Sequence, residues 1–179
     1  MAVITELMDV RDMDELYSIS DIIQIGSRNM QNFTLLSEVG KQNKPVMLKR
    51  GIASTITEWI GASEYIAIEG NSNIIMCERG IRTYNDYTRN TLDLSAVPAV
   101  KKLSHLPVVI DPSHAAGKWW MVDPLSKAAV AIGADGLIIE VHNDPANAWC
   151  DGQQSIKPDV YGNLLEELRV IAKAVGREI

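Results

Sequence analysis

The sequence predicts an α/β fold of parallel strands joined by helices, and two observations carry that prediction. Short runs rich in Ile and Val, apolar on both faces, alternate with helix-length amphipathic segments, as in a parallel sheet covered by helices. The runs also end in polar or charged residues, which favours a (β/α)8 barrel because its strand ends converge on one site. A doubly wound open sheet is the alternative, but the Gly-rich phosphate loop expected after its first strand does not occur.

Six runs are predicted to be strands: "AVITELMD" from Ala2, "DIIQIG" from Asp21, "PVMLKRG" from Pro45, "NIIMCERG" from Asn73, "PVVIDPSH" from Pro107 and "GLIIEVH" from Gly136. Helical patterns are expected at 35–42, 57–69, 96–104, 124–132 and 158–176. The capping residues Thr55 to Glu58 and the pair Asp123-Pro124 mark two helix starts. Six βα units are fewer than the eight of a TIM (β/α)8-type barrel, and the count alone does not explain this difference.

Composition narrows the class of protein. A chain of 179 residues that is 46% hydrophobic can bury one core, so residues 1–179 are predicted to form a single domain. The formal net charge of −6, without a basic stripe, argues against binding to nucleic acid or to a membrane surface. No apolar run reaches the ~20 residues needed to cross a bilayer. The two cysteines, Cys77 and Cys150, form no CxxC motif, which favours a reducing cytoplasmic location.

Two groups of residues at the ends of the predicted strands suggest chemistry. His114, Glu140 and Asp151 are nitrogen and oxygen donors on the last two strands and the loop that follows them. Such a set suits a divalent cation such as Mn, Fe(II) or Zn with positions open for water and substrate. Three cations end earlier strands, and together they would neutralise a phosphate and a carboxylate: Arg28, Lys49 and Arg79. A metal beside an anion site predicts an enzyme for phosphorylated metabolites, with the reaction left open.

Longer motifs carry a specific resemblance. The segments "IQIGSRNMQNF", "KPVMLKRG", "CERGIRTY", "TRNTLDLSAVP", "LPVVIDPSHAAGK", "GADGLIIEVH" and "DGQQS" occur in this order along nearly the whole chain. They resemble 3-deoxy-D-arabino-heptulosonate 7-phosphate (DAHP) synthase of the microbial β-type of class I. The resemblance implies a metal-dependent transferase (phospho-2-dehydro-3-deoxyheptonate aldolase) that condenses phosphoenolpyruvate with erythrose 4-phosphate. This reaction is the first step of the shikimate pathway of aromatic amino acid biosynthesis.

The resemblance also implies roles for individual residues. His114, Glu140 and Asp151 match the metal ligands of the family, and Arg28, Lys49 and Arg79 match its phosphoenolpyruvate-binding cations. Lys49 and His114 are therefore expected to be catalytic. Of the adjacent pair Lys49 and Arg50, the family motif selects Lys49, since neighbouring strand residues point to opposite faces.

The sequence departs from the family at its start. Members of the family have two earlier strands that carry further motifs. One is a "GPCS"-type motif, whose Cys is a fourth metal ligand, and the other is a "KPRTS"-type motif that binds the substrates' anionic groups. Neither motif occurs in this sequence. We therefore expect about the last six βα units of the barrel: a truncated gene product, one piece of a split enzyme or an artificially shortened form. The alternative function is a catalytically impaired binding or assembly subunit, or the complement of a separate N-terminal piece. The expected state is a homo-oligomer or such a complementing fragment.

Overall fold

The computed structural model describes residues 1–179, which divide into two compact units. The first unit comprises Met1–Cys77 and Ala99–Pro107, and the second comprises Glu78–Pro98 and Val108–Ile179. The helix α4 (Ala96–Leu103) crosses the boundary in sequence. The expectation of a single domain over 1–179 stays a prediction, so each unit is described separately. No helix is long and apolar enough to span a membrane.

The first unit is built on the parallel strands β1 (Ile4–Glu6), β2 (Ile22–Ile25), β3 (Val46–Lys49) and β4 (Ile74–Glu78). Glu78, the last residue of β4, belongs to the second unit. Each strand pairs in parallel with the next, with Ile4 opposite Ile22, Ile23 opposite Val46, and Val46 opposite Ile74. All four residues of β3 are buried, as expected for a parallel strand covered on both faces. The predicted strands are therefore confirmed here, with shorter bounds.

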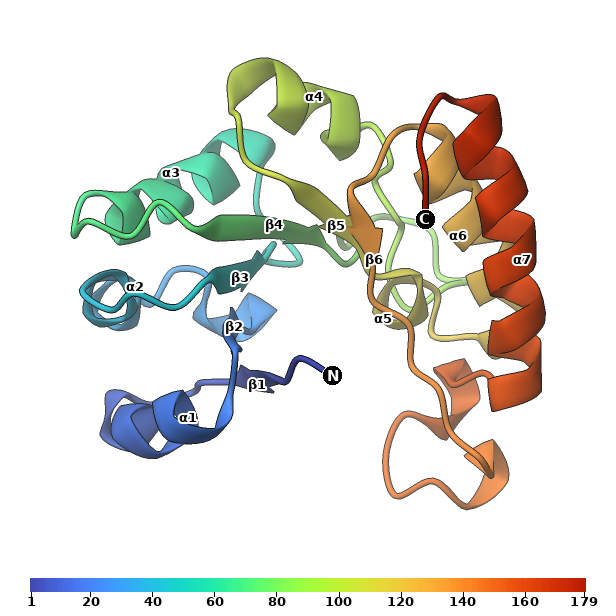
Figure 1. The fold of residues 1–179 in the computed structure, drawn as a ribbon, viewed down its shortest axis with the longest axis horizontal. Coiled ribbons are helices and arrows are strands. Elements are labelled where there is room, and N and C mark those ends of the chain that lie inside the picture. The colour runs from blue at the N-terminus through green and yellow to red at the C-terminus, as the bar shows by residue number, and fades with distance from the viewer. The chain divides into compact units, whose positions relative to one another are not determined.

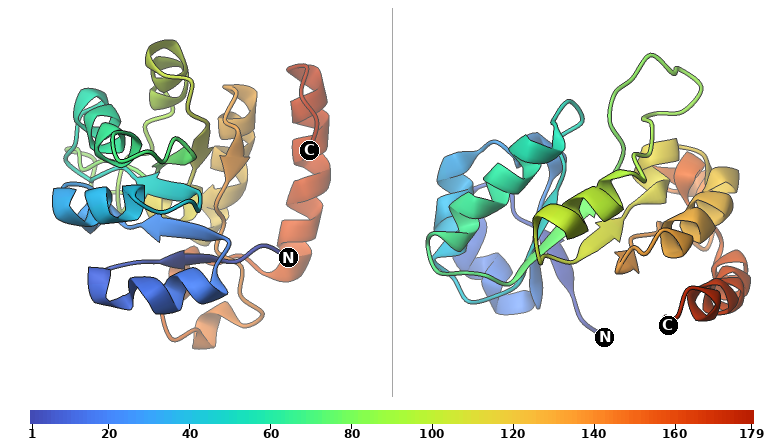
Figure 2. Two further views of the ribbon diagram at one scale, coloured as in Figure 1. Left: turned by 60° about the vertical axis from the view of Figure 1, so that its left-hand side comes forward. Right: turned by 90° about the horizontal axis from the view of Figure 1, so that it is seen from above.

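Three helices connect these strands: α1 (Met13–Ile19), α2 (Phe33–Gly40) and α3 (Ile56–Ala67). Figures 1 and 2 show α2 and α3 side by side along the strands. Thr55 caps α3 through a capping box with Glu58, which confirms the predicted start of this helix. Helix α1 was not predicted from the sequence, because its apolar residues at helical spacing, Met13, Leu16 and Tyr17, extend over only seven residues.

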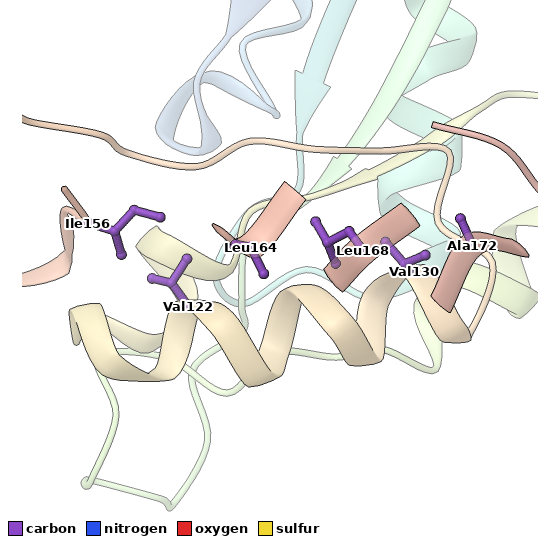
Figure 3. Close-up of a cluster of buried hydrophobic side chains, with 6 residues drawn as sticks. All are labelled: Val122, Val130, Ile156, Leu164, Leu168 and Ala172. Atoms are coloured by element: carbon purple, nitrogen blue, oxygen red, sulfur yellow. The ribbon is translucent and has the colours of Figure 1, made fainter. Parts of the chain in front are cut away.

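The second unit contains the parallel pair β5 (Val108–Ile110) and β6 (Gly136–Leu137), with Val109 opposite Gly136. Its helices are α5 (Pro112–Ala116), α6 (Trp119–Ala131) and α7 (Pro158–Ala174), with the short 3-10 helices η3 (Pro145–Asn147) and η4 (Gly152–Gln154) between β6 and α7. Helices α6 and α7 pack against each other along an apolar seam (Figure 3), whose members are Val122, Val130, Ile156, Leu164, Leu168 and Ala172.

One predicted helix start is wrong. Asp123 and Pro124 were expected to open the helix at 124–132, but α6 begins at Trp119 and contains Pro124. A proline lacks the N–H that would bond to the carbonyl four residues earlier, here that of Trp120. Since Trp120 lies in the exposed first turn of α6, water can satisfy this carbonyl and the helix tolerates the proline.

Close packing of α2 and α3 depends on a glycine. A Cβ placed on Gly40 would lie 2.5 Å from the backbone oxygen of Ile66, whereas one on Gly61 would meet nothing within 4 Å. We therefore expect Gly40→Ala to lower the free energy of unfolding by about 1–3 kcal/mol through overpacking. In contrast, Gly61→Ala should raise it by about 0.5–1 kcal/mol, because alanine favours the helix interior. Urea denaturation of both variants checks the pair, and equal effects would contradict this account of the helix contact.

Candidate metal site

The turn from β5 into α5 holds the first donor. Asp111 follows β5 directly and caps α5, its Oδ1 accepting a hydrogen bond from the backbone N–H of His114 at 3.0 Å. Its other oxygen, Oδ2, lies 2.8 Å from His114 Nδ1. Because Asp111 is fully buried, the ring is held by a group that cannot turn toward water. A carboxylate at Nδ1 fixes the tautomer and orientation of an imidazole and leaves Nε2 for the site.

Glu140 supplies the second donor, three residues after β6. Its backbone N–H donates to the buried hydroxyl of Ser113 at 3.0 Å, and its Oε1 lies 2.9 Å from His114 Nε2. Burial raises the pKa of the Glu140 carboxyl. The hydrogen bond and charge of His114, together with the hydrogen bond from Gln154, lower this pKa by more than burial raises it. The net pKa lies below its ordinary value, so the group is a carboxylate at neutral pH, the form that binds metal ions.

Asp151, the third donor, lies just before η4 on the loop after β6. Its φ of 53° makes it the only non-glycine residue in the left-handed region, where aspartate is tolerated better than most residues. Gly152 follows because a Cβ there would lie 2.1 Å from the oxygen of Pro145. Ser155 closes the turn, its hydroxyl donating to the Asp151 backbone oxygen at 3.1 Å.

The structure brings these three predicted residues together. One ligand atom from each of His114, Glu140 and Asp151 lies within 4.8 Å of the others. Two nitrogen or oxygen ligands that each lie about 2.0–2.2 Å from one ion are at most about 4.4 Å from each other. A small movement of the three side chains toward one another would therefore bring them to ligand distances. The donor set therefore fits a divalent cation, and the role of the three residues as ligands stays a prediction.

Two further residues of the site were not assigned to it by the sequence analysis. Gln154 donates from Nε2 to Glu140 Oε1 at 3.0 Å and accepts at Oε1 from Arg89 Nη1 at 3.1 Å. Arg89 Nη1 also donates to Asp151 Oδ1 at 3.2 Å. Gln154 lies within the quoted motif "DGQQS", but only burial distinguishes it from the exposed Gln153.

The predicted anion-binding cations belong to both units. In the first unit, Arg28 is exposed on η2 (Ser27–Asn29), just after β2, and Lys49 is the buried last residue of β3. Arg79, in the second unit, follows β4 and is also buried. Arg50 is buried too, and its Nε donates to the backbone oxygen of Ser54 at 3.0 Å.

Three polar residues near the strand ends and the donors have well-defined surroundings. Glu78 is fully buried and its Oε1 accepts the backbone N–H of Gly80 at 2.6 Å, so it orders the turn after β4. Asn90 holds its loop against α5, its backbone N–H donating to the oxygen of Ala115 at 2.8 Å. Cys150, which adjoins Asp151, is exposed and lies outside the group of donors that converge.

The fold and the site define a class of protein, the α/β proteins of the barrel type whose polar residues gather after the carboxyl ends of parallel strands. Comparison with known families makes this specific. The profile of the DAHP synthetase I family matches residues 1–175. The chain therefore belongs to the DAHP synthetase I family, as its motifs predicted.

Individual relatives agree. The chain is 51% identical over 179 residues to the phospho-2-dehydro-3-deoxyheptonate aldolase of Thermotoga maritima, covering all of this chain and 53% of that protein. Its structure superposes on the crystal structure of that DAHP synthase with a TM-score of 0.98 over 99% of this chain. The TM-score to a truncated form of the Thermotoga maritima enzyme is also 0.98, and the chain covers 68% of that form. A 2-dehydro-3-deoxyphosphooctonate aldolase of Geobacter sulfurreducens is 32% identical, with 94% of this chain and 65% of that protein covered.

These matches confirm the predicted fold class, a TIM-type barrel represented by six βα units. The identity to the phospho-2-dehydro-3-deoxyheptonate aldolase, 51%, is higher than the 32% identity to the 2-dehydro-3-deoxyphosphooctonate aldolase. The chain spans about half the length of the Thermotoga relative it matches.

The site predicts metal binding that can be measured without catalysis. We expect Mn(II) to bind the purified chain at one site in isothermal titration calorimetry. His114→Ala, Glu140→Ala and Asp151→Ala should each weaken binding more than the 10–100-fold typical of losing an outer partner of a ligand. Cys150→Ser, next to Asp151 but exposed, is the matched control and should leave the affinity unchanged. Affinity that depends on Cys150 instead would identify a different ligand set.

Proposed function

We propose that this chain carries the metal- and phosphoenolpyruvate-binding part of a DAHP synthase, which condenses phosphoenolpyruvate with erythrose 4-phosphate. The observation that supports this most is the convergence of His114, Glu140 and Asp151 within 4.8 Å in a member of the DAHP synthetase I family. Metal dependence, both substrates and the place of the reaction at the start of the shikimate pathway belong to the proposal. The metal is divalent, with Mn, Fe and Zn all compatible with these donors.

Three cations would hold phosphoenolpyruvate by its phosphate and carboxylate. Arg28 and Arg79 offer planar guanidinium groups that match such oxyanions with two parallel hydrogen bonds. Lys49 is only 7% exposed at the end of β3, so its ammonium group would interact with the substrate in a site of low dielectric. This setting strengthens its attraction for an anion and suits it to offset negative charge that develops during the reaction.

The reaction forms one carbon–carbon bond. The methylene carbon of phosphoenolpyruvate attacks the aldehyde carbon of erythrose 4-phosphate, water adds at the neighbouring carbon, and inorganic phosphate leaves by C–O cleavage. A bound divalent metal would polarise the aldehyde oxygen as a Lewis acid. The chain's own contribution is to keep His114 oriented through Asp111 and to keep Glu140 ionised beside it. Side chains that are already oriented can hold the reactants in the reacting geometry, which removes much of the entropic part of the activation barrier.

The remaining parts of the proposal concern setting and assembly. Small anionic substrates rather than nucleic acid agree with a formal net charge of −6. A cytoplasmic location agrees with two free cysteines, Cys77 and Cys150. A homo-oligomer, or a complex with a complementing piece, is the proposed state in solution.

Phosphate release tests the function. With phosphoenolpyruvate and Mn(II) supplied, we expect release that requires erythrose 4-phosphate, and His114→Ala should reduce it to background because the aldehyde oxygen loses its activation. His105→Ala, on an exposed residue outside the site, is the control and should keep the rate of the unmodified chain. Release that persists in His114→Ala would contradict the role given to this residue.

The second candidate is a binding or assembly subunit, and a groove in the second unit supports it. The groove has a volume of about 680 Å³ and runs between β6 and α7, lined by Leu137, Ile139, Tyr161, Leu165 and Leu168 among others. β6 pairs with β5, and an unpaired strand edge is a template for a further strand. The proposed occupant is the earlier part of a DAHP synthase barrel, since the chain matches only 68% of the truncated Thermotoga enzyme.

Complementation tests this second candidate. The part of the truncated Thermotoga enzyme that this chain does not match would be produced as a separate polypeptide and mixed with it. We expect a one-to-one complex in analytical ultracentrifugation, and Leu137→Asp, which introduces a charge into the groove, should weaken it at least tenfold. Val170→Asp, on the exposed face of α7, is the matched control. A complex that is indifferent to Leu137→Asp would exclude this groove as the docking surface.

A further inference from the structure

Gln154 is a buried polar side chain whose amide is fully engaged within the candidate site. It is 2% exposed, its Nε2 donates to Glu140 Oε1 at 3.0 Å, and its Oε1 accepts from Arg89 Nη1 at 3.1 Å. Burying an amide is unfavourable unless both of its ends are hydrogen-bonded. A leucine would fill the same volume without that requirement, so packing alone does not explain the residue.

Arg89 determines which way this amide points. A guanidinium group has only donors, so the oxygen of Gln154 must face Arg89. The amide nitrogen is then directed at Glu140, where a donor stabilises the charged carboxylate. Since Arg89 Nη1 also donates to Asp151 Oδ1 at 3.2 Å, the two carboxylates are linked through one arginine and one glutamine.

The exposed pair of Arg89 and Asp151 would by itself be worth little, because water screens it. The contact of Gln154 with Glu140 is different, since Gln154 is only 2% exposed and its Nε2 lies 3.0 Å from Glu140 Oε1, where water screens the hydrogen bond less. Gln154 is therefore the buried side-chain link from Arg89, which holds Asp151, to the Glu140 carboxylate, beside the backbone hydrogen bond from Ile156 to Glu140.

We propose that Gln154 is a positioning residue for the metal site: it orients the Glu140 carboxylate, and Arg89 sets the direction of its amide. This inference rests on the proposed function in taking Glu140 and Asp151 as metal ligands. It assigns Gln154 an effect on metal affinity that exceeds its effect on folding, because its two hydrogen bonds end on site residues rather than on the core.

Mn(II) titration calorimetry of Gln154→Leu, with thermal unfolding measured alongside, tests the inference. We expect Mn(II) affinity to fall 10–100-fold, the range typical of losing an outer partner of a ligand. Gln153→Leu is the matched control: it changes the adjacent, exposed glutamine and should alter the affinity less than twofold. Gln154→Glu keeps a partner for Arg89 but sets a carboxylate against Glu140, so it should weaken binding at least as much as Gln154→Leu.

A double-mutant cycle separates positioning from a structural role. If Arg89 acts partly through Gln154, the loss in Arg89→Leu/Gln154→Leu will be smaller than the product of the two single losses. Wild-type affinity in a folded Gln154→Leu or Gln154→Glu chain would overturn the inference and leave the metal site intact. Absence of Mn(II) binding by the unmodified chain would instead overturn the proposed metal site, and this inference with it.

Discussion

The second unit depends on one buried carboxylate. Asp111 is fully buried where β5 ends, and both of its oxygens are used within three residues, one on the backbone N–H and one on the ring of His114. An unpaired buried carboxylate would be strongly destabilising, so the strand-to-helix turn and the orientation of the histidine stabilise each other. Any substitution that frees one oxygen of Asp111 disturbs the fold and the site together.

From this turn the rest of the site follows through hydrogen bonds. Ser113 receives the backbone N–H of Glu140, which ties the segment after β6 to the start of α5. The side chain of Glu140 then meets His114 and Gln154, and Gln154 reaches Arg89. Each donor group is thus held by a neighbour on another element, the arrangement by which proteins keep ligands in place without a metal.

How much the sequence predicted depended on the kind of signal. Apolar runs located all six strands, and donors after them were found because parallel strands end at the same edge. Helices α5 and α1 were missed because they have only five and seven residues, too few for a helical period to stand out in the sequence. Pro124 was misread as a helix start, since the helix tolerates a proline whose unbonded carbonyl partner, that of Trp120, lies in its exposed first turn. Gln154 and Arg89, 65 residues apart, have no pattern that links them; only the fold does.

The two carboxylates of the site are oriented by different means. Asp151 takes its direction from the backbone, through a left-handed residue followed by a glycine that allows close approach to Pro145. Such residues cost about 1–3 kcal/mol of strain and persist where the surrounding structure determines them. Glu140 takes its direction from side chains, through His114 and Gln154. The backbone conformation at Asp151 is reflected in the Asp-Gly pair of the sequence. The orientation of Glu140 depends on side chains elsewhere in the chain, so no local sequence pattern indicates it.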